Sequence, residues 1–200
     1  PVIVVTDPAQ AVPMAEALLA GGVDVMEITL RSAAGLAAIE AVARAVPEMQ
    51  VGAGTVTRAS EVAQVLAAGA RFGLSPGSTP DLLAAVLAAG LPFVPGVASP
   101  SEAMAARDAG FTLMKCFPAA QLGGVEVLKA WGGPLPDLRF CPTGGVSLAN
   151  MGSFLALPNV AMVGGSWLTP AAAVKAGDWA QITRLAREAT DAVAALQAGR

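Results

Sequence analysis

The fold is decided by the stretch from Phe93 to Pro118, which reads FVPGVASPSEAMAARDAGFTLMKCFP. Its two ends are short apolar runs, which predict strands over Phe93–Pro95 and Thr112–Phe117. The alanine-rich segment between them, Ser101–Ala109, has the composition of a helix, and Ser99-Pro100 is typical of a helix start. A strand, a helix and a second strand at this spacing indicate a parallel βαβ unit.

The same alternation of strand and helix runs through the whole chain. The other predicted strands are Val2–Val5, Val25–Leu30, Val51–Gly54, Phe72–Leu74, Arg139–Pro142 and Ala161–Val163. The other predicted helices include Val12–Ala20, Leu36–Val46, Ala59–Ala68, Asp81–Ala89 and Trp179–Leu196. Eight strand units in 200 residues predict a compact (β/α)8 TIM barrel of the α/β class, with residues 1–200 as one domain. The alternative is a doubly wound open sheet, which needs fewer strands.

Composition narrows the class of protein. Hydrophobic residues make up 54% of the chain against 14% charged, which is typical of a globular domain with a substantial core. The apolar runs are shorter than the roughly 18 residues of a membrane span, and Pro1–Val5 is too short for a signal peptide. A net charge of −3 without a basic cluster argues against nucleic acid, and two cysteines are no disulfide framework. A reducing cytoplasm is the location we expect.

The chain contains no histidine, and one of its three lysines lies in an apolar strand. That residue is Lys115. Side chains alternate along a strand, so Leu113, Lys115 and Phe117 are expected on one face. Desolvation favours the neutral amine, which is a nucleophile toward carbonyl groups. The alternative is a lysine that extends from the strand end into solvent. Without histidine or clustered carboxylates, we expect neither a metal site nor a cofactor.

A carboxylate and a guanidinium share one face of another predicted strand, because Glu27, Thr29 and Arg31 alternate along it. Glu27 is suited to proton transfer, and the planar fork of Arg31 matches a substrate carboxylate. The alternative is an internal ion pair between the two residues. Thr55 ends the next strand, after Gly52-Ala-Gly54, and offers a hydroxyl where small residues let a ligand approach the backbone.

Two glycine pairs follow the last two predicted strands. Gly144-Gly145 and Gly164-Gly165 expose consecutive N–H groups, and Ser166 adds a hydroxyl donor. In (β/α)8 barrels the loops after these strands frequently bind phosphate, with help from a short helix. The alternative is that the glycines only make tight turns. An amine, a carboxylate, an arginine and a phosphate loop together suit a phosphorylated 2-keto acid as substrate.

Six segments in order carry a resemblance to a known family. They are Glu27–Arg31 (EITLR), Val51–Val56 (VGAGTV), Ser75–Gly77 (SPG), Lys115–Pro118 (KCFP), Arg139–Gly145 (RFCPTGG) and Gly164–Leu168 (GGSWL). With these, the chain closely resembles the bacterial 2-keto-3-deoxy-6-phosphogluconate (KDPG) aldolases, which often also act on 4-hydroxy-2-oxoglutarate (KHG). The resemblance runs essentially from Val2 to Ala189.

The resemblance implies a homotrimeric barrel and a class I aldolase of the Entner–Doudoroff pathway, a lyase that forms a Schiff base and yields pyruvate and glyceraldehyde 3-phosphate. It implies the following roles: Lys115 as the Schiff-base lysine, Glu27 as the acid and base, Arg31 and Thr55 at the substrate carboxylate, Pro76, Phe117 and Thr143 along the pocket, and Gly144, Gly145, Gly165 and Ser166 at the phosphate. It leaves the gluconate and galactonate epimers undistinguished.

The chain departs from this family in three places. Members usually carry a short helix before the first strand, whereas this sequence begins at Pro1, on that strand. Cys116 replaces an aromatic residue and by strand alternation faces away from Lys115, so we expect a change in packing only. Ala120 stands where a glutamate is frequent, which bears on substrate preference. Two rival functions stay open: a phosphosugar isomerase or lyase without a Schiff base, and a non-catalytic binding protein.

Overall fold

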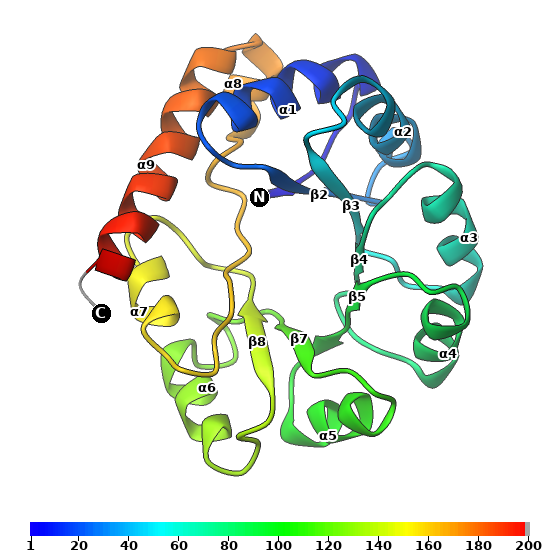
Figure 1. Cartoon of the computed structure of the whole chain (residues 1–200), viewed down its shortest axis with the longest axis vertical. Coiled ribbons are helices and arrows are strands. Elements are labelled where there is room, and N and C mark those ends of the chain that lie inside the picture. Colours follow the sequence, from blue (N-terminus) through cyan, green and yellow to red (C-terminus); the bar gives the residue numbers. More distant parts are fainter. Residues whose placement is uncertain (199–200) are drawn as a thin grey trace. The chain divides into compact units, whose positions relative to one another are not determined.

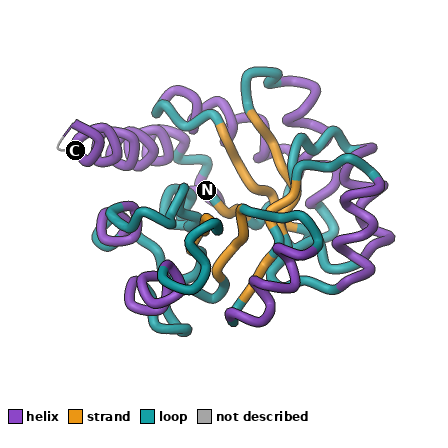
Figure 2. Tube along the Cα trace, turned by 60° about the horizontal axis from the view of Figure 1, so that its bottom comes forward, coloured by secondary structure: helices purple, strands orange, loops and turns teal. Residues whose placement is uncertain are grey.

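The computed structural model describes residues 1–198, in which strands and helices alternate along the chain (Figures 1 and 2). Each strand ladder in it is parallel, which confirms the predicted α/β class. By its internal contacts the chain divides into two compact units. Unit 1 contains Pro1–Gly54, Gln64–Arg71 and residues from 166 onward, and unit 2 contains Thr55–Ala63 and Phe72–Gly165.

Unit 1 contains three parallel strands in the order β1–β2–β3. They span Val2–Ile3, Val25–Thr29 and Gln50–Gly54. Its helical elements are η1 (Pro8–Gln10), α1 (Ala11–Ala20), α2 (Gly35–Ala45), α8 (Ala171–Ala176) and α9 (Trp179–Ala198). The helix α3 (Ala59–Ala67) has residues in both units. The long helix α9 packs against α1, where Thr183 donates to the carbonyl of Ala17 at 2.9 Å.

Unit 2 contains two parallel ladders, β4–β5 and β6–β7–β8. Its strands are β4 (Gly73–Leu74), β5 (Phe93–Val94), β6 (Gly96–Val97), β7 (Leu113–Cys116) and β8 (Arg139–Pro142). Its helices are α4 (Pro80–Ala88), α5 (Pro100–Asp108), α6 (Val125–Gly132) and α7 (Met151–Leu155). The helix start predicted at Ser99-Pro100 is confirmed, because the Ser99 hydroxyl accepts a bond from the Glu102 N–H, and Thr79 caps α4 in the same way through the Leu82 N–H.

The strand predicted at Ala161–Val163 is not regular, which corrects the sequence prediction. Isolated bridges flank it on β8, joining Phe140 to Val160 and Thr143 to Gly164. The segment takes four residue steps between these bridges where β8 takes three, so one residue is unpaired and the ladder is interrupted as in a β-bulge. The strand predicted at Phe93–Pro95 is β5, which ends at Val94 because Pro95 has no N–H to donate, and the sequence did not predict the short strand β6 that follows at Gly96–Val97.

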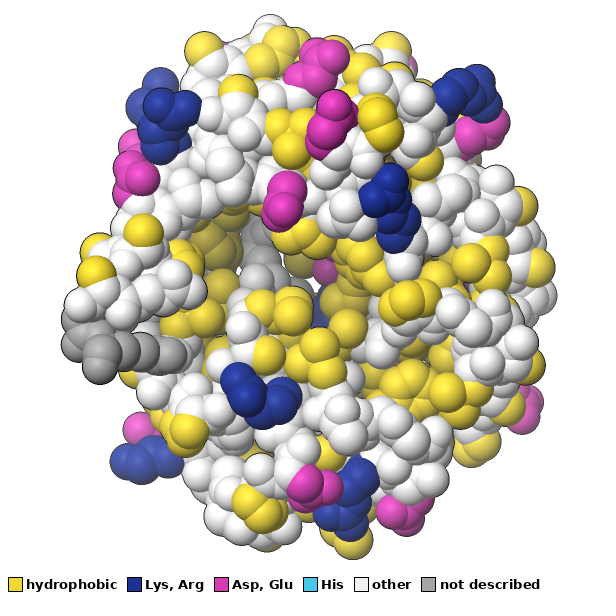
Figure 3. Space-filling view, in the orientation of Figure 1, with side chains coloured by type: hydrophobic (Ala, Val, Ile, Leu, Met, Phe, Trp, Pro, Cys, Tyr) yellow, Lys and Arg dark blue, Asp and Glu magenta, His cyan; other side chains and the backbone are white. Residues whose placement is uncertain are grey.

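The strands are lined by buried aliphatic side chains, and the buried charged residues in the described chain are Glu27 and Lys115. On the face shown in Figure 3, lysine and arginine side chains lie singly among acidic ones and do not gather into a basic patch. Among the helices of residues 1–198, each is too short or too polar to cross a membrane.

Candidate functional site

Lys115 lies on β7 with 5% of its surface exposed. Its Nζ lies 5.5 Å from the centroid of the Phe117 ring, so strand alternation correctly placed both side chains on one face. This contact is a cation–π geometry when the amine is protonated and an apolar wall when it is neutral. The prediction that Lys115 is buried is therefore confirmed, and an extended lysine at the strand end is not observed.

The register of unit 2 brings other predicted residues to the same face. Lys115 pairs with Gly96 on β6 and with Cys141 on β8. A Cβ at Gly96 would lie 2.3 Å from the Pro76 carbonyl carbon, so the chain at Pro76 crosses directly over the glycine next to Lys115. On the other side, the Cys141 Sγ lies 3.8 Å from the Thr143 hydroxyl oxygen.

Glu27 is positioned by β2 in unit 1 and is 6% exposed. Its side chain lies against Gly54 of β3, because a Cβ at Gly54 would be 2.1 Å from the Glu27 Oε1. Arg31 follows β2 and is exposed. Within the described chain Arg31 makes no salt bridge, so the internal ion pair with Glu27 is not formed.

Thr55 directly follows Gly54 and has a left-handed backbone, with φ of 59°. For a β-branched residue this conformation is strained, and strained residues concentrate at functional sites. Val56 then bonds to the carbonyl of Leu74 at 3.1 Å, which fixes the chain that leaves β3. The position of Thr55 after the third predicted strand made it a candidate site residue, but the sequence gave no sign of the backbone strain.

The loop after β8 is built from two glycines with positive φ, 96° at Gly144 and 77° at Gly145. The bridge between Thr143 and Gly164 engages the Gly144 N–H with the Gly164 carbonyl, whereas within residues 1–198 the N–H groups of Gly145 and Gly165 have no intramolecular acceptor. The helix expected beside them is displaced, because α7 begins only at Met151 and has five residues. The backbone N–H groups of this loop, and not a helix terminus, are therefore its candidate donors to an anion.

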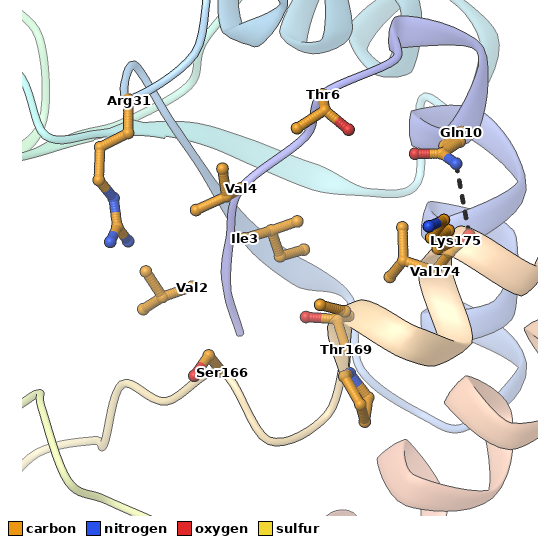
Figure 4. Close-up of a pocket in the computed structure, with 12 residues that line it drawn as sticks. Val2, Ile3, Val4, Thr6, Gln10, Arg31, Ser166, Thr169, Val174 and Lys175 are labelled. Atoms are coloured by element: carbon orange, nitrogen blue, oxygen red, sulfur yellow. Dashed lines mark hydrogen bonds between the residues drawn. The ribbon is translucent and has the colours of Figure 1, made fainter.

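Arg31 and Ser166 line one pocket of about 670 Å³ in unit 1 (Figure 4). Its walls come from β1, η1, the end of β2 and the segment from Ser166 to Lys175. Gln10 crosses to this segment, donating to the carbonyl of Val174 at 3.3 Å. Lys175 also lines the pocket, beside Gln10, and is exposed to solvent there. The sequence alone does not place Lys175 in this pocket, because its place there depends on the proximity of α8 to β1 in the tertiary fold.

The thiols of Cys116 and Cys141 are both buried. Burial raises the pKa of the Cys116 thiol to about 11, and Cys141 nearby adds to that rise. Cys116 pairs in register with Pro142, while Cys141 pairs with Lys115, so the two thiols lie on opposite faces of neighbouring strands. Among residues 1–198, no group of three or more acidic or cysteine side chains could hold a metal ion.

Comparison with known proteins gives one consistent result. The family described as KDPG and KHG aldolase matches residues 1–185. A 2-dehydro-3-deoxy-phosphogluconate aldolase of Pseudoalteromonas atlantica is 52% identical over 98% of this chain and 91% of its own length. The KHG/KDPG aldolase of Escherichia coli K12 is 51% identical over 96% of this chain and 90% of its own length.

A solved structure gives the same result for the fold. The KDPG aldolase of Legionella pneumophila, with pyruvate captured as a covalent carbinolamine, has a TM-score of 0.92 at 46% identity. The likeness covers 94% of this chain and 91% of that one. Its α/β barrel class is the class predicted from the eight strand units, and that prediction is confirmed.

Proposed function

The chain belongs to the KDPG and KHG aldolase family, and from this premise we propose that it is a class I aldolase acting on 2-dehydro-3-deoxy-6-phosphogluconate. The products are pyruvate and glyceraldehyde 3-phosphate. The observation that carries the proposal is the burial of Lys115, which is 5% exposed beside the Phe117 ring. A buried strand lysine against an apolar wall is suited to imine formation with a ketone.

The proposed reaction begins when the Lys115 amine attacks the C2 ketone and forms a carbinolamine. Loss of water gives an iminium, which accepts the electron pair of the breaking C3–C4 bond. The C4 hydroxyl loses its proton as the aldehyde forms, and the resulting enamine takes a proton at C3 before water releases pyruvate. Glu27 moves these protons, directly or through water.

Binding residues complete the proposal. Arg31 and Thr55 hold the substrate carboxylate, while Pro76, Phe117 and Thr143 line the pocket. Gly144, Gly145, Gly165 and Ser166 hold the phosphate, and the N–H groups of Gly145 and Gly165, which lack acceptors in the described chain, support this assignment. No metal or organic cofactor enters any step of this scheme.

The experiment that tests the proposal is reduction with borohydride in the presence of pyruvate. Peptide mass spectrometry should find the reduced adduct on Lys115, because only an imine is trapped this way. Lys129→Ala is the matched control and should be labelled as fully as the natural chain. Absence of an adduct in a folded protein that still cleaves substrate would favour the isomerase-like chemistry without a Schiff base.

We propose KHG as a second substrate, since the similar Escherichia coli protein is named for both. Ser166→Ala separates the two substrates, because a lost phosphate donor should lower kcat/KM for the phosphorylated substrate several-fold more than for KHG. Equal losses on both would remove Ser166 from the phosphate site. Pyruvate release, coupled to NADH oxidation, measures each rate.

We further propose a homotrimer of single-domain chains in the cytoplasm, working in the Entner–Doudoroff pathway. Exposed apolar side chains on the neighbouring helices α4 and α5 support association, since Leu87 is 53% and Met104 is 46% exposed. Two buried thiols suit a reducing compartment. Light scattering after size exclusion should give three times the chain mass, and a monomer mass would contradict the trimer.

A further inference from the structure

We infer that Gly54 is a positioning residue for Glu27: its missing side chain is the space in which the carboxylate of Glu27 lies. The inference rests on the proposed function for its catalytic meaning, but its geometry is independent of that function. Both residues belong to unit 1, on the neighbouring parallel strands β2 and β3.

The space is defined by three distances. A Cβ built on Gly54 would lie 2.1 Å from Oε1, 2.6 Å from Cγ and 2.7 Å from Cδ of Glu27. Contacts below 3.0 Å are essentially never made by real Cβ atoms, so any side chain at position 54 competes with Glu27. Because Cγ is among the three atoms, turning the carboxylate alone gives no relief. Glu27 has to change its χ1 rotamer, which redirects the whole side chain.

The register shows why the displacement matters. Glu27 is level with Gly52, whereas Gly54 is level with Thr29, two residues nearer the C-terminal end of the strands. The Glu27 side chain therefore leans forward, over Gly54, toward the edge at which (β/α)8 enzymes carry out their chemistry. With a larger residue at position 54, the carboxylate would be held back from this edge.

Backbone conformation does not explain the glycine. Gly54 lies outside the group of residues with positive φ, so alanine suits its backbone. The sequence interpretation, that small residues here admit a ligand to the backbone, also needs correction at this position. On the face toward which a side chain would point, the neighbour of Gly54 is Glu27. Gly54→Ala should thus fold, since the displaced atoms belong to a flexible side chain.

Gly54→Ala should lower kcat roughly 10- to 100-fold, within the range that positioned acid–base groups contribute, and change KM less than about 3-fold. Gly133→Ala is the matched control. It adds the same methyl group after α6, where the nearest atom would be the Ala130 carbonyl oxygen at 3.9 Å, and φ is −68°. Its kinetics should equal those of the natural chain.

A double-mutant cycle decides whether the methyl group acts through Glu27. In Glu27→Ala the Cγ, Cδ and Oε1 atoms are gone, so the methyl group that Gly54→Ala adds has room. Residual pyruvate methyl-proton exchange, followed by NMR in deuterium oxide, should then be the same within about 2-fold for Glu27→Ala alone and for Glu27→Ala combined with Gly54→Ala. If Gly54→Ala lowers exchange by the same factor in both backgrounds, the inference is overturned.

A second measurement on the same double-mutant cycle does not depend on enzyme activity. Chemical unfolding of the same four proteins should show any destabilisation by Gly54→Ala in the natural background disappear in the Glu27→Ala background. If Glu27→Ala is fully active, the proposed acid–base role of Glu27 fails, while a crystal structure of Gly54→Ala still tests the displacement. An unmoved Glu27 in that structure would refute the positioning role, whatever the kinetics.

Discussion

Each compact unit contains a glycine that makes room for a polar side chain on the neighbouring strand, but the two side chains differ in stiffness. In unit 1, Gly54 lies under Glu27, and in unit 2, Gly164 lies under Thr143, whose Oγ1 would be 2.3 Å from an added Cβ. Glutamate is flexible and can move away, whereas threonine is branched at Cβ and nearly fixed at χ1. The same arrangement should therefore affect catalysis in unit 1 and stability in unit 2.

The largest expected effect is on stability, from Gly164→Ala. The added methyl group would also meet Thr143 Cγ2 at 3.2 Å and Cβ at 3.3 Å, and the contact with Cβ stays tight whichever rotamer Thr143 adopts. We expect the free energy of unfolding to fall by about 3 kcal/mol, at the upper end for overpacking. Urea denaturation measures it.

The matched variant for that prediction is Gly164→Ala combined with Thr143→Ala. Removing Oγ1 and Cγ2 clears the space, so the pair should recover most of the lost stability relative to Thr143→Ala alone. Should Gly164→Ala be as stable as the natural chain, the distinction between stiff and flexible neighbours would fail.

The sequence predicted the local features of both units but not the contacts between neighbouring strands. Alternation along a strand placed Lys115 and Phe117 on one face, and Ser99-Pro100 marked the start of a helix, because these signals are local. The interrupted pairing of Val160–Gly164 with β8 depends on which residues face each other across strands. For the same reason Gly54 suggested a ligand-facing backbone, although its neighbour is Glu27.

The second prediction concerns the buried thiols of Cys116 and Cys141, which belong to unit 2 as Thr143 does. The pKa of Cys116 is raised from 9.0 to about 11, so the unfolded chain ionises first as pH rises. Stability is then intact below pH 9 and is lost progressively as the pH rises to about 11, by about 2 to 3 kcal/mol.

Cys116→Val should remove this alkaline loss, while Cys141→Val should leave most of it. Unfolding free energies of the three proteins between pH 8 and 11 test the prediction, and ultraviolet thiolate absorbance follows the titration directly. The absence of tyrosine from the chain removes the usual overlapping phenolate signal. A natural chain as stable at pH 11 as at pH 8 would contradict the burial argument.

A third prediction returns to β2 and asks whether Arg31 works apart from Glu27. Because Arg31 makes no salt bridge within the described chain, its guanidinium is available to a substrate carboxylate. Arg31→Lys keeps the charge but loses the planar fork, so kcat/KM should fall roughly 10-fold. Steady-state pyruvate release measures it, and unchanged kinetics would mean that charge alone suffices.

The smallest effect is expected at Lys175, in the pocket that also contains Arg31 and Ser166. Lys175 is exposed on α8, so its attraction for an anionic substrate is screened by water and salt. Lys175→Gln should lower kcat/KM about 2- to 3-fold at low ionic strength through KM, and the difference should vanish in high salt.

Lys129→Gln, which removes an exposed lysine from α6 in the other unit, is the matched control and should leave kcat/KM unchanged at every salt concentration. A loss that persists in high salt would instead indicate a direct contact between Lys175 and the substrate. Equal losses in both variants would show that only the net charge of the protein matters. The proposed anion binding in the pocket around Ser166 would then rest on Arg31 and hydrogen-bond donors alone.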